Sequence, residues 1–112
     1  MLRAASDEVV VYITVSSSAE AETLAQTIVS EKLAACVNVV PGIRSFYRWE
    51  GKVQDDAELL LIVKTLRPTL NALYEKIREL HSYEVPEFIV LPVAEGSQDY
   101  LDWLTQSVSN EP

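Results

Sequence analysis

The stretch that decides the fold of this chain is Ile43-Arg44-Ser45-Phe46-Tyr47-Arg48-Trp49-Glu50-Gly51-Lys52. Every second residue from Ile43 to Trp49 faces one way, and the residues between them face the other, which is the period of a β-strand. Glu50-Gly51 predicts a tight turn, and Lys52 to Thr65 runs back as a second strand with a polar centre and an apolar end. We therefore expect a long central β-hairpin.

The length of this hairpin predicts where it lies. Its second strand, of fourteen residues, spans about 46 Å when extended at ~3.3 Å per residue. A compact domain of this size has a radius of gyration of roughly 13 Å and a diameter of about 35 Å. Either the strand bends near Asp55-Asp56 and folds onto its own core, or the hairpin projects beyond the domain. We favour a projecting arm whose aromatic residues are covered by other copies of the chain in a homo-oligomer.

Before the hairpin, the pattern predicts a strand, a helix and another strand. Val9–Val15 is a continuous β-branched and aromatic run, typical of a buried strand. Ser17 and Glu20 fit a capping box, and apolar residues then recur at helical spacing. Leu33–Val40 follows as a strand, and Pro41-Gly42 interrupts it as a bulge or an edge position would.

After the hairpin, the period changes to that of a helix. Pro68 suits the first helical position, and the helix ends near His81. Glu87–Val93 predicts a fourth strand, and Gly96-Ser97 introduces a last helix. This order, β-α-β-β-α-β with an added C-terminal helix, is that of an α+β ferredoxin-like sandwich.

We expect one domain over residues 1–112, with residues 1–7 and 109–112 as frayed tails. The two main helices cover one face of the sheet. The other face is then covered by the last helix, by partner subunits or by water.

Composition excludes several classes of protein. The chain has 112 residues, a net charge of −8 and a single Cys, so nucleic-acid binding is disfavoured and no internal disulfide forms. No apolar run approaches the ~20 residues that span a bilayer, and the N-terminus turns acidic before any signal-peptide core. We expect a cytoplasmic protein without membrane contact, and its length requires no metal for folding.

Two side chains are the strongest candidate metal ligands, and each has a structural alternative. Cys36 lies in an apolar strand, where a free Cys often acts as a small buried hydrophobe. His81 ends a helix, where an imidazolium is favoured by the helix dipole. Asp55-Asp56 with Glu58 could hold a hard cation, but adjacent strand residues point to opposite faces. We interpret these acidic residues as a solvated strand edge that discourages aggregation.

Functional groups are densest in the connection His81-Ser82-Tyr83-Glu84-Val85-Pro86-Glu87. It brings an imidazole, a phenol and two carboxylates together just before a strand, where sites commonly lie. Lys64, at the apolar end of the hairpin, requires a carboxylate, an anionic ligand or a path to solvent.

These residues together resemble the CutA divalent-cation tolerance family. The resemblance is carried by Glu31-Lys32-Leu33-Ala34-Ala35-Cys36-Val37-Asn38, Pro41, Ser45, Tyr47, Trp49-Glu50-Gly51-Lys52, Lys64-Thr65, His81 to Glu87, Leu91-Pro92-Val93, Gly96, Tyr100-Leu101 and Trp103-Leu104. It extends from about Val9 to Val108.

The resemblance implies a ferredoxin-like subunit in a tight homotrimer, with the hairpin arms packed against neighbouring subunits. It also implies a role in tolerance to divalent metals, particularly copper, and we expect copper first and zinc second as the bound ion. The matched ligand positions are Cys36 and His81, with Tyr83, Glu84 and Glu87 close to the latter.

Three functions compete at this point, and a purely structural trimer is a further alternative. The first is a non-catalytic, trimeric divalent-metal binding protein. The second is a small-molecule-sensing regulator of the PII-like type, whose inter-subunit clefts receive a small anion or metabolite. The cleft residues in these hypotheses are Tyr47, Trp49, Lys64, Tyr83, Glu84 and Glu87. The third, ranked last because no nucleophile or cofactor is evident, is an enzyme that uses His81, Tyr83 or Glu84 as an acid or base.

Overall fold

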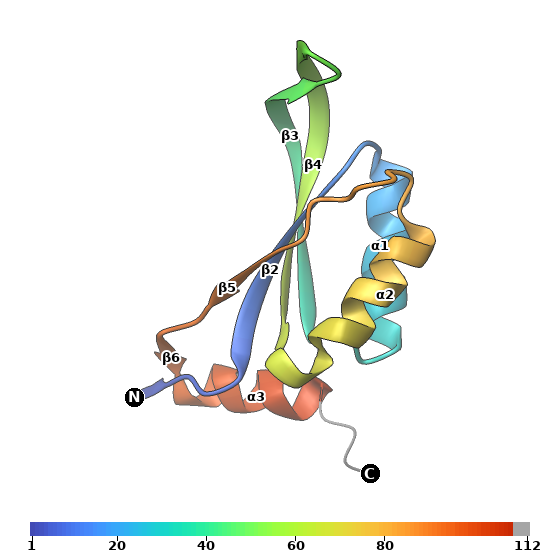
Figure 1. Ribbon diagram of the computed structural model, residues 1–112. Coiled ribbons are helices and arrows are strands. Elements are labelled where there is room, and N and C mark those ends of the chain that lie inside the picture. Colours follow the sequence, from blue (N-terminus) through green and yellow to red (C-terminus); the bar gives the residue numbers. More distant parts are fainter. Residues whose placement is uncertain (109–112) are drawn as a thin grey trace.

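The structure, a computed structural model, describes residues 1–108, so the tail predicted at residues 109–112 lies outside the described part. The elements follow in the order β1 (Leu2–Ala4), β2 (Glu8–Val15), α1 (Ser18–Ser30), β3 (Cys36–Trp49), β4 (Lys52–Leu66), a 3₁₀ turn (Arg67–Thr69), α2 (Leu70–Leu80), β5 (Ile89–Pro92), β6 (Glu95–Ser97) and α3 (Gln98–Val108). Figure 1 shows their arrangement.

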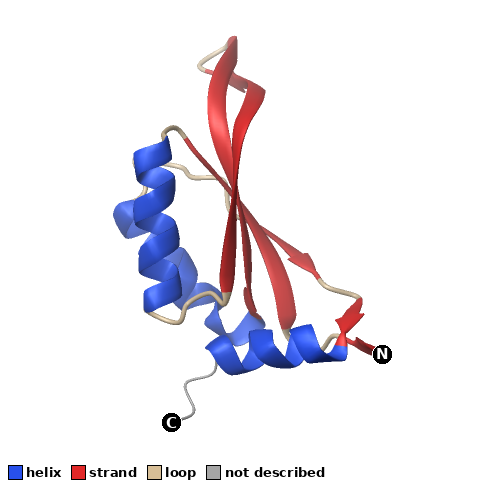
Figure 2. Cartoon of the chain, turned by 180° about the vertical axis from the view of Figure 1, so that it is seen from behind, coloured by secondary structure: helices blue, strands red, loops and turns tan. Residues whose placement is uncertain are grey.

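The main sheet confirms the predicted α+β ferredoxin-like order. Its four strands are arranged β3-β4-β2-β5, and every neighbouring pair is antiparallel. Helices α1 and α2 lie on one side of this sheet, and α3 crosses its end (Figure 2). A second small sheet joins β1 to β6.

The core lies between the sheet and the two long helices. Alternate residues of β2 and β4 point toward the helices, and they pack there against apolar residues of α1 and α2. The fully buried members of this cluster include Val11, Ile13, Leu61, Val63, Leu24, Ile28, Leu73 and Ile77. Burial of this many large side chains stabilises the sheet–helix pair, at ~1.5–3 kcal/mol for each side chain before entropic costs.

The opposite side of the sheet, which we call the open face, is apolar but largely uncovered by the described chain. It carries Val10, Tyr12 and Ile62, which are half-buried, and Ile89 and Leu91, which are 53% and 36% exposed. Helix α3 reaches only the end of this face, where the Thr105 hydroxyl lies 3.2 Å from a carboxylate oxygen of Glu8.

The hairpin of β3 and β4 projects beyond the helices as the arm that its length predicts (Figure 1). The molecule extends 46 Å along its longest axis, and its radius of gyration is 14.9 Å. A register shift between Val40 and Ile43 marks the predicted bulge, where Gly42 has a φ of +77°. Trp49 pairs with Lys52 across the turn, so the predicted Glu50-Gly51 turn is also confirmed.

The N-terminus differs from the prediction of a frayed tail over residues 1–7. Leu2–Ala4 pair with Glu95–Ser97, and the Arg3 guanidinium contacts Glu8 at 2.8 Å and Asp102 at 3.1 Å. The sequence pattern misses this strand because its partner, a three-residue strand, lies more than ninety positions away in the chain.

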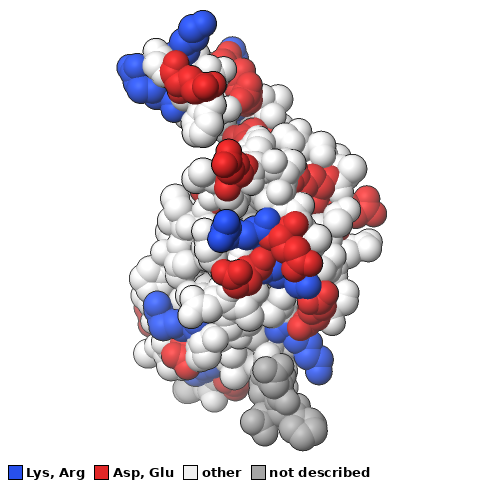
Figure 3. Space-filling view, turned by 45° about the vertical axis from the view of Figure 1, so that its right-hand side comes forward, with Lys and Arg blue, Asp and Glu red and all other residues white. Residues whose placement is uncertain are grey.

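Charges of both signs are interspersed over the face of the molecule in Figure 3, and no basic patch stands out there. Within residues 1–108, no helix combines the length and the apolar character that crossing a membrane requires.

Candidate functional site

The main pocket lies where the base of the arm faces the connection between α2 and β5. Its volume is about 660 Å³, which is in the range of small-molecule sites. From the arm, the lining residues are Ser45, Phe46, Tyr47, Trp49 and Glu58. From the connection, they are Ser82, Tyr83, Glu84, Val85 and Glu87, and Thr14 of β2 completes the lining.

The pleat of the arm explains why Ser45, Tyr47, Trp49 and Glu58 line the pocket together. Ile43 pairs with Glu58, Ser45 with Asp56 and Tyr47 with Gln54, so these residues share one face of the hairpin. That face is continuous with the open face of the sheet. Glu58 is only 6% exposed, because the connection covers it, whereas Trp49 further out on the arm is 53% exposed.

His81 fixes the position of the connection. Its Nε2–H donates to the Thr14 carbonyl oxygen at 2.8 Å, and its Nδ1 accepts the Tyr83 N–H at 2.9 Å. A carbonyl only accepts and an amide N–H only donates, so these partners assign the neutral tautomer protonated on Nε2. The imidazole therefore joins β2 to the wall of the pocket.

A second anchor for the connection comes from Glu20 of α1. Its carboxylate accepts hydrogen bonds from the Ser82 N–H at 2.7 Å and from the Ser82 hydroxyl at 3.0 Å. Burial tends to raise the pKa of Glu20, but these bonds outweigh it and leave the pKa below its usual value. The predicted capping box is formed only in part, since Ser17 Oγ accepts the Glu20 N–H at 3.1 Å while the Glu20 carboxylate binds the connection instead.

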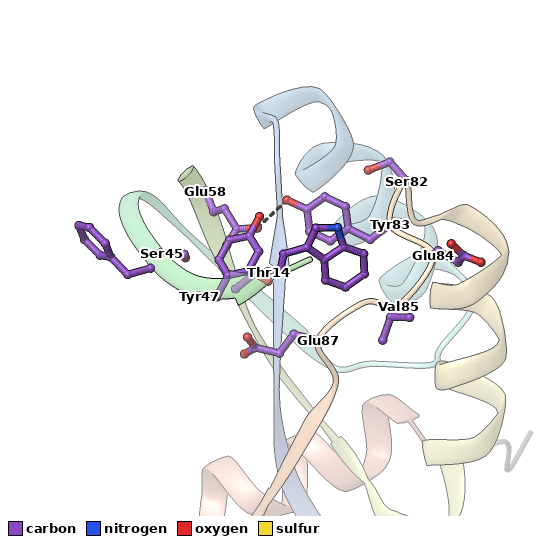
Figure 4. A pocket seen from close by; sticks show the side chains of 11 residues that line it. Thr14, Ser45, Tyr47, Glu58, Ser82, Tyr83, Glu84, Val85 and Glu87 are labelled. Atoms are coloured by element: carbon purple, nitrogen blue, oxygen red, sulfur yellow. Dashed lines mark hydrogen bonds between the residues drawn. The ribbon is translucent and has the colours of Figure 1, made fainter. Parts of the chain in front are cut away.

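Two phenols in the pocket lining donate hydrogen bonds to carboxylates. Tyr83 donates its hydroxyl proton to Glu58 at 2.6 Å, and Tyr47 donates to Asp56. Burial and the Glu58 carboxylate raise the pKa of Tyr83, and the bond to Asp56 raises that of Tyr47. Both phenols therefore stay protonated at neutral pH, and Figure 4 shows their rings on either side of the Glu58 carboxylate.

The pocket is acidic. Glu58, Glu84 and Glu87 line it, and no lining residue within the described chain is Lys or Arg. Partial desolvation and the charge of Glu58 raise the pKa of Glu87. In Figure 4 the Glu87 side chain lies below the two tyrosine rings, whereas the Glu84 carboxylate points away from them.

Five of the predicted cleft residues come together in this pocket, and the sixth does not. Tyr47, Trp49, Tyr83, Glu84 and Glu87 all line it. Lys64 lies toward the other end of the sheet, paired with Cys36 and Val10, and its ammonium donates to the side chain of Asn38. Within one chain Lys64 lies apart from the other five, because the strand register places it six residues from Glu58. Its place in an inter-subunit cleft stays a prediction.

The two predicted metal ligands also lie apart. Cys36 sits beside Lys64 on the open face, while His81 contacts Thr14, four residues further along β2 than Val10. Both nitrogens of His81 already have hydrogen-bond partners. Among residues 1–108, no group of three or more His, Cys, Asp or Glu side chains is close enough to hold a metal ion. One chain therefore offers no Cys/His metal centre among its described residues.

Glu58, which we interpreted from the sequence as part of a solvated edge, is buried in the pocket lining instead. The signal was present in the alternation of the hairpin, since Glu58 has the same parity as Leu60 and Ile62 and therefore faces the open side of the sheet. What could not be seen was the cover provided by Tyr83, 25 residues further along.

Comparisons with known proteins agree with this fold. The family model "CutA1 divalent ion tolerance protein" matches residues 9–107. The chain is 53% identical to the divalent-cation tolerance protein CutA of Thermus thermophilus over 100 residues, which is 89% of this chain and 97% of that one. It is 54% identical to a chloroplastic CutA of Arabidopsis thaliana over 91% of this chain, but spans only 56% of that relative.

Two solved structures are informative. The Thermus thermophilus structure aligns with a TM-score of 0.89 at 52% identity, over 91% of this chain and 99% of that one. CutA from Synechococcus elongatus, complexed with a Bis-Tris molecule, aligns with a TM-score of 0.88 at 37% identity, over 96% and 99% of the two chains.

Proposed function

Since this chain belongs to the CutA1 divalent ion tolerance family, we propose that it is a non-catalytic protein that binds divalent metal ions as a homotrimer. The observation that carries the proposal is the acidic pocket, in which Glu58, Glu84 and Glu87 surround one cavity. Carboxylates spread around a cavity of this size favour cations, but they form a weak site when they do not converge. The proposed affinity of one chain for a metal ion is therefore modest.

The metal is copper first and zinc second. Copper(II) is the strongest binder of the common divalent ions at nearly any nitrogen or oxygen site, so copper binding alone carries little information. The ratio of the copper and zinc affinities is the informative quantity.

Assembly provides a way to complete a metal site. Cys36 lies on the open face, the surface that another copy of the chain covers in the proposed trimer. Three copies supply three Cys36 thiols and three sets of pocket carboxylates. His81 contributes only if it gives up its bond to Thr14 or to Tyr83.

The trimer is supported by two surfaces that the described chain leaves uncovered. The open face exposes large apolar side chains such as Ile89, and contiguous apolar surface of this kind marks protein interfaces. Strand β3 is an edge strand with exposed aromatic side chains on the arm, including Phe46 and Trp49. A neighbouring copy that packs against the arm covers both.

A competition titration tests the metal proposal. Copper and zinc are titrated into the wild-type protein, Glu87→Gln, Cys36→Ser and His81→Ala in the presence of a chromophoric chelator. Glu95→Gln is the matched control, because Glu95 is exposed and lies in β6. We expect Glu87→Gln and Cys36→Ser to weaken copper binding several-fold. Unchanged affinity in both variants, or equal losses in Glu95→Gln, would contradict the proposal.

A second candidate function is the sensing of a small molecule. The pocket's volume of about 660 Å³ and its aromatic lining favour it, and a CutA relative has been seen with a Bis-Tris molecule. A metabolite panel followed by thermal unfolding tests this candidate, because a ligand of the native state raises the unfolding temperature. The absence of any shift would count against it.

The compartment belongs to the proposal as well. A cytoplasmic location is proposed from the single Cys, which forms no internal disulfide, whereas the Arabidopsis relative is named as chloroplastic. Cell fractionation with detection of the native protein tests it.

A further inference from the structure

Strands β1 and β6 and helix α3 form a unit at the end of the main sheet opposite the arm (Figure 1). β1 pairs with β6, and the Met1 carbonyl oxygen accepts the N–H of Gln98, the first residue of α3, at 2.9 Å. A Cβ atom on Gly96 of β6 would lie 3.3 Å from the side chain of Leu101, so β6 and α3 are in close contact. We call these three elements the terminal unit.

The apolar contacts of the terminal unit are separate from the main core. Leu101, Leu104 and Val108 of α3 are buried, but they do not belong to the cluster that fills the space between the main sheet and helices α1 and α2. An element attached by such a separate set of contacts can open locally while the rest of a protein stays folded.

Arg3 joins the terminal unit to the main sheet. Its guanidinium contacts a carboxylate oxygen of Glu8, the first residue of β2, at 2.8 Å and one of Asp102 in α3 at 3.1 Å. The Thr105 hydroxyl of α3 adds a longer contact to Glu8 at 3.2 Å. The Glu8 side chain is only 1% exposed, so solvent weakens this ion pair less than it weakens a surface pair. Breaking the Arg3 bridge therefore removes the main polar attachment of α3 to β2.

These contacts do not depend on neighbouring copies of the chain. Each of them joins two residues of the same chain, and they lie far from the arm, at the other end of the sheet (Figure 1). A copy that covers the open face adds contacts to α3 without removing these. The Arg3 side of the bridge also precedes the part of the chain that the family model matches, which begins at residue 9.

We propose that the terminal unit is a conformational device. Its three elements leave the end of the main sheet together while the main sheet, α1 and α2 stay folded, and the Arg3 bridge controls how often this happens. Because α3 lies at the end of the open face, its departure uncovers that end. The proposal rests neither on metal binding nor on the trimer.

Native-state hydrogen exchange of the full chain, followed by mass spectrometry, tests this proposal. In the wild type, amides of β6 and α3 should exchange together and faster than those of β2 and β4. Their exchange should also depend less steeply on urea, because local opening exposes less surface than global unfolding. Amides of α3 that exchange as slowly as those of β2 and β4 would show one cooperative unit and overturn the proposal.

Two variants that each remove one positive charge test the bridge. Arg3→Met should speed the exchange of α3 amides about tenfold or more, because it removes charge-assisted hydrogen bonds. Lys76→Met removes the 3.3 Å contact of α2 with Glu31, which lies in the part that stays folded, so its α3 amides should exchange as in the wild type. Asp102→Asn, which weakens only the half-exposed side of the bridge, should give a smaller acceleration than Arg3→Met. Unchanged α3 exchange in Arg3→Met, or equal acceleration in Lys76→Met, would refute the role of the bridge.

Discussion

His81, the single His of the chain, stabilises the fold. Its two ring nitrogens join the Thr14 carbonyl to the Tyr83 N–H, and its side chain is fully buried. A residue that was a candidate metal ligand in the sequence thus positions the wall of the pocket.

We expect His81→Ala to lower the free energy of unfolding by about 2–4 kcal/mol, because it opens a cavity and leaves two buried backbone groups unpaired. Urea unfolding at fixed protein concentration measures this. Ser82→Ala, which removes only the exposed hydroxyl bond to Glu20, should cost less than ~1 kcal/mol. A His81→Ala loss as small as that of Ser82→Ala would contradict the structural role.

Glu8 predicts a pH dependence of stability. Its side chain is 1% exposed, and burial tends to raise its pKa, but the N–H groups of Ser6 and of Glu8 itself and the Arg3 guanidinium lower it from 4.5 to about 2. Because the folded-state pKa lies below the unfolded-state value, the ionised carboxylate stabilises the fold above about pH 4.5. This contribution, ~3 kcal/mol at neutral pH, is lost as the pH falls toward 2.

The measurement is the free energy of unfolding of the wild type and of Glu8→Gln across this pH range. The difference between the two proteins should be largest near neutral pH and shrink as the solution is acidified. The free energy of unfolding of Glu95→Gln should change with pH in the same way as that of the wild type. A difference that stays constant with pH would show that the Glu8 charge does not contribute.

At the scale of elements, the arm depends on a two-residue turn in an unusual conformation. Glu50 has a φ of +51° and Gly51 a φ of +77°, which suits a primed hairpin turn. A left-handed conformation costs a non-glycine residue such as Glu roughly 1–2 kcal/mol, while Asn tolerates it better.

Glu50→Asn should therefore stabilise the protein by about 0.5–1 kcal/mol. Thermal or urea unfolding gives the value. Glu50→Ala is the control, because it removes the same carboxylate without the tolerance of Asn for this conformation. Equal effects of the two substitutions would contradict the explanation.

At the scale of the whole molecule, some residues of the open face matter for the proposed assembly and not for the fold of one chain. Ile89 is 53% exposed on this face, so the fold of one chain does not need its side chain. Ile89→Lys should keep the fold and disrupt the proposed trimer, because a charge would be buried at the interface.

Light scattering coupled to size-exclusion chromatography measures the result. The wild type should have about three times the chain mass of 12.5 kDa, and Ile89→Lys should have a lower mass with an unchanged circular-dichroism spectrum. Val29→Lys, a change at an exposed apolar residue of α1, should remain trimeric. A monomeric wild type would refute the assembly.

The sequence by itself determined the order of the principal strands and helices, the arm and its turn, and which residues of the arm share a face. These features follow from local rules, namely the periods of helix and strand, the turn residues and the caps. It also carried the family resemblance through motifs such as His81 to Glu87.

Only the tertiary structure decided the chemistry of the pocket. In the folded chain the first residues pair with β6, and the strand register places Lys64 away from the tyrosines. Tyr83 covers Glu58, and both ring nitrogens of His81 form hydrogen bonds. Apart from the bond of His81 to the Tyr83 N–H, which is local, each of these contacts joins residues from 25 to more than ninety positions apart or depends on the register between strands. Local periodicity does not specify such contacts, because they form only when the sheet and its helices pack together.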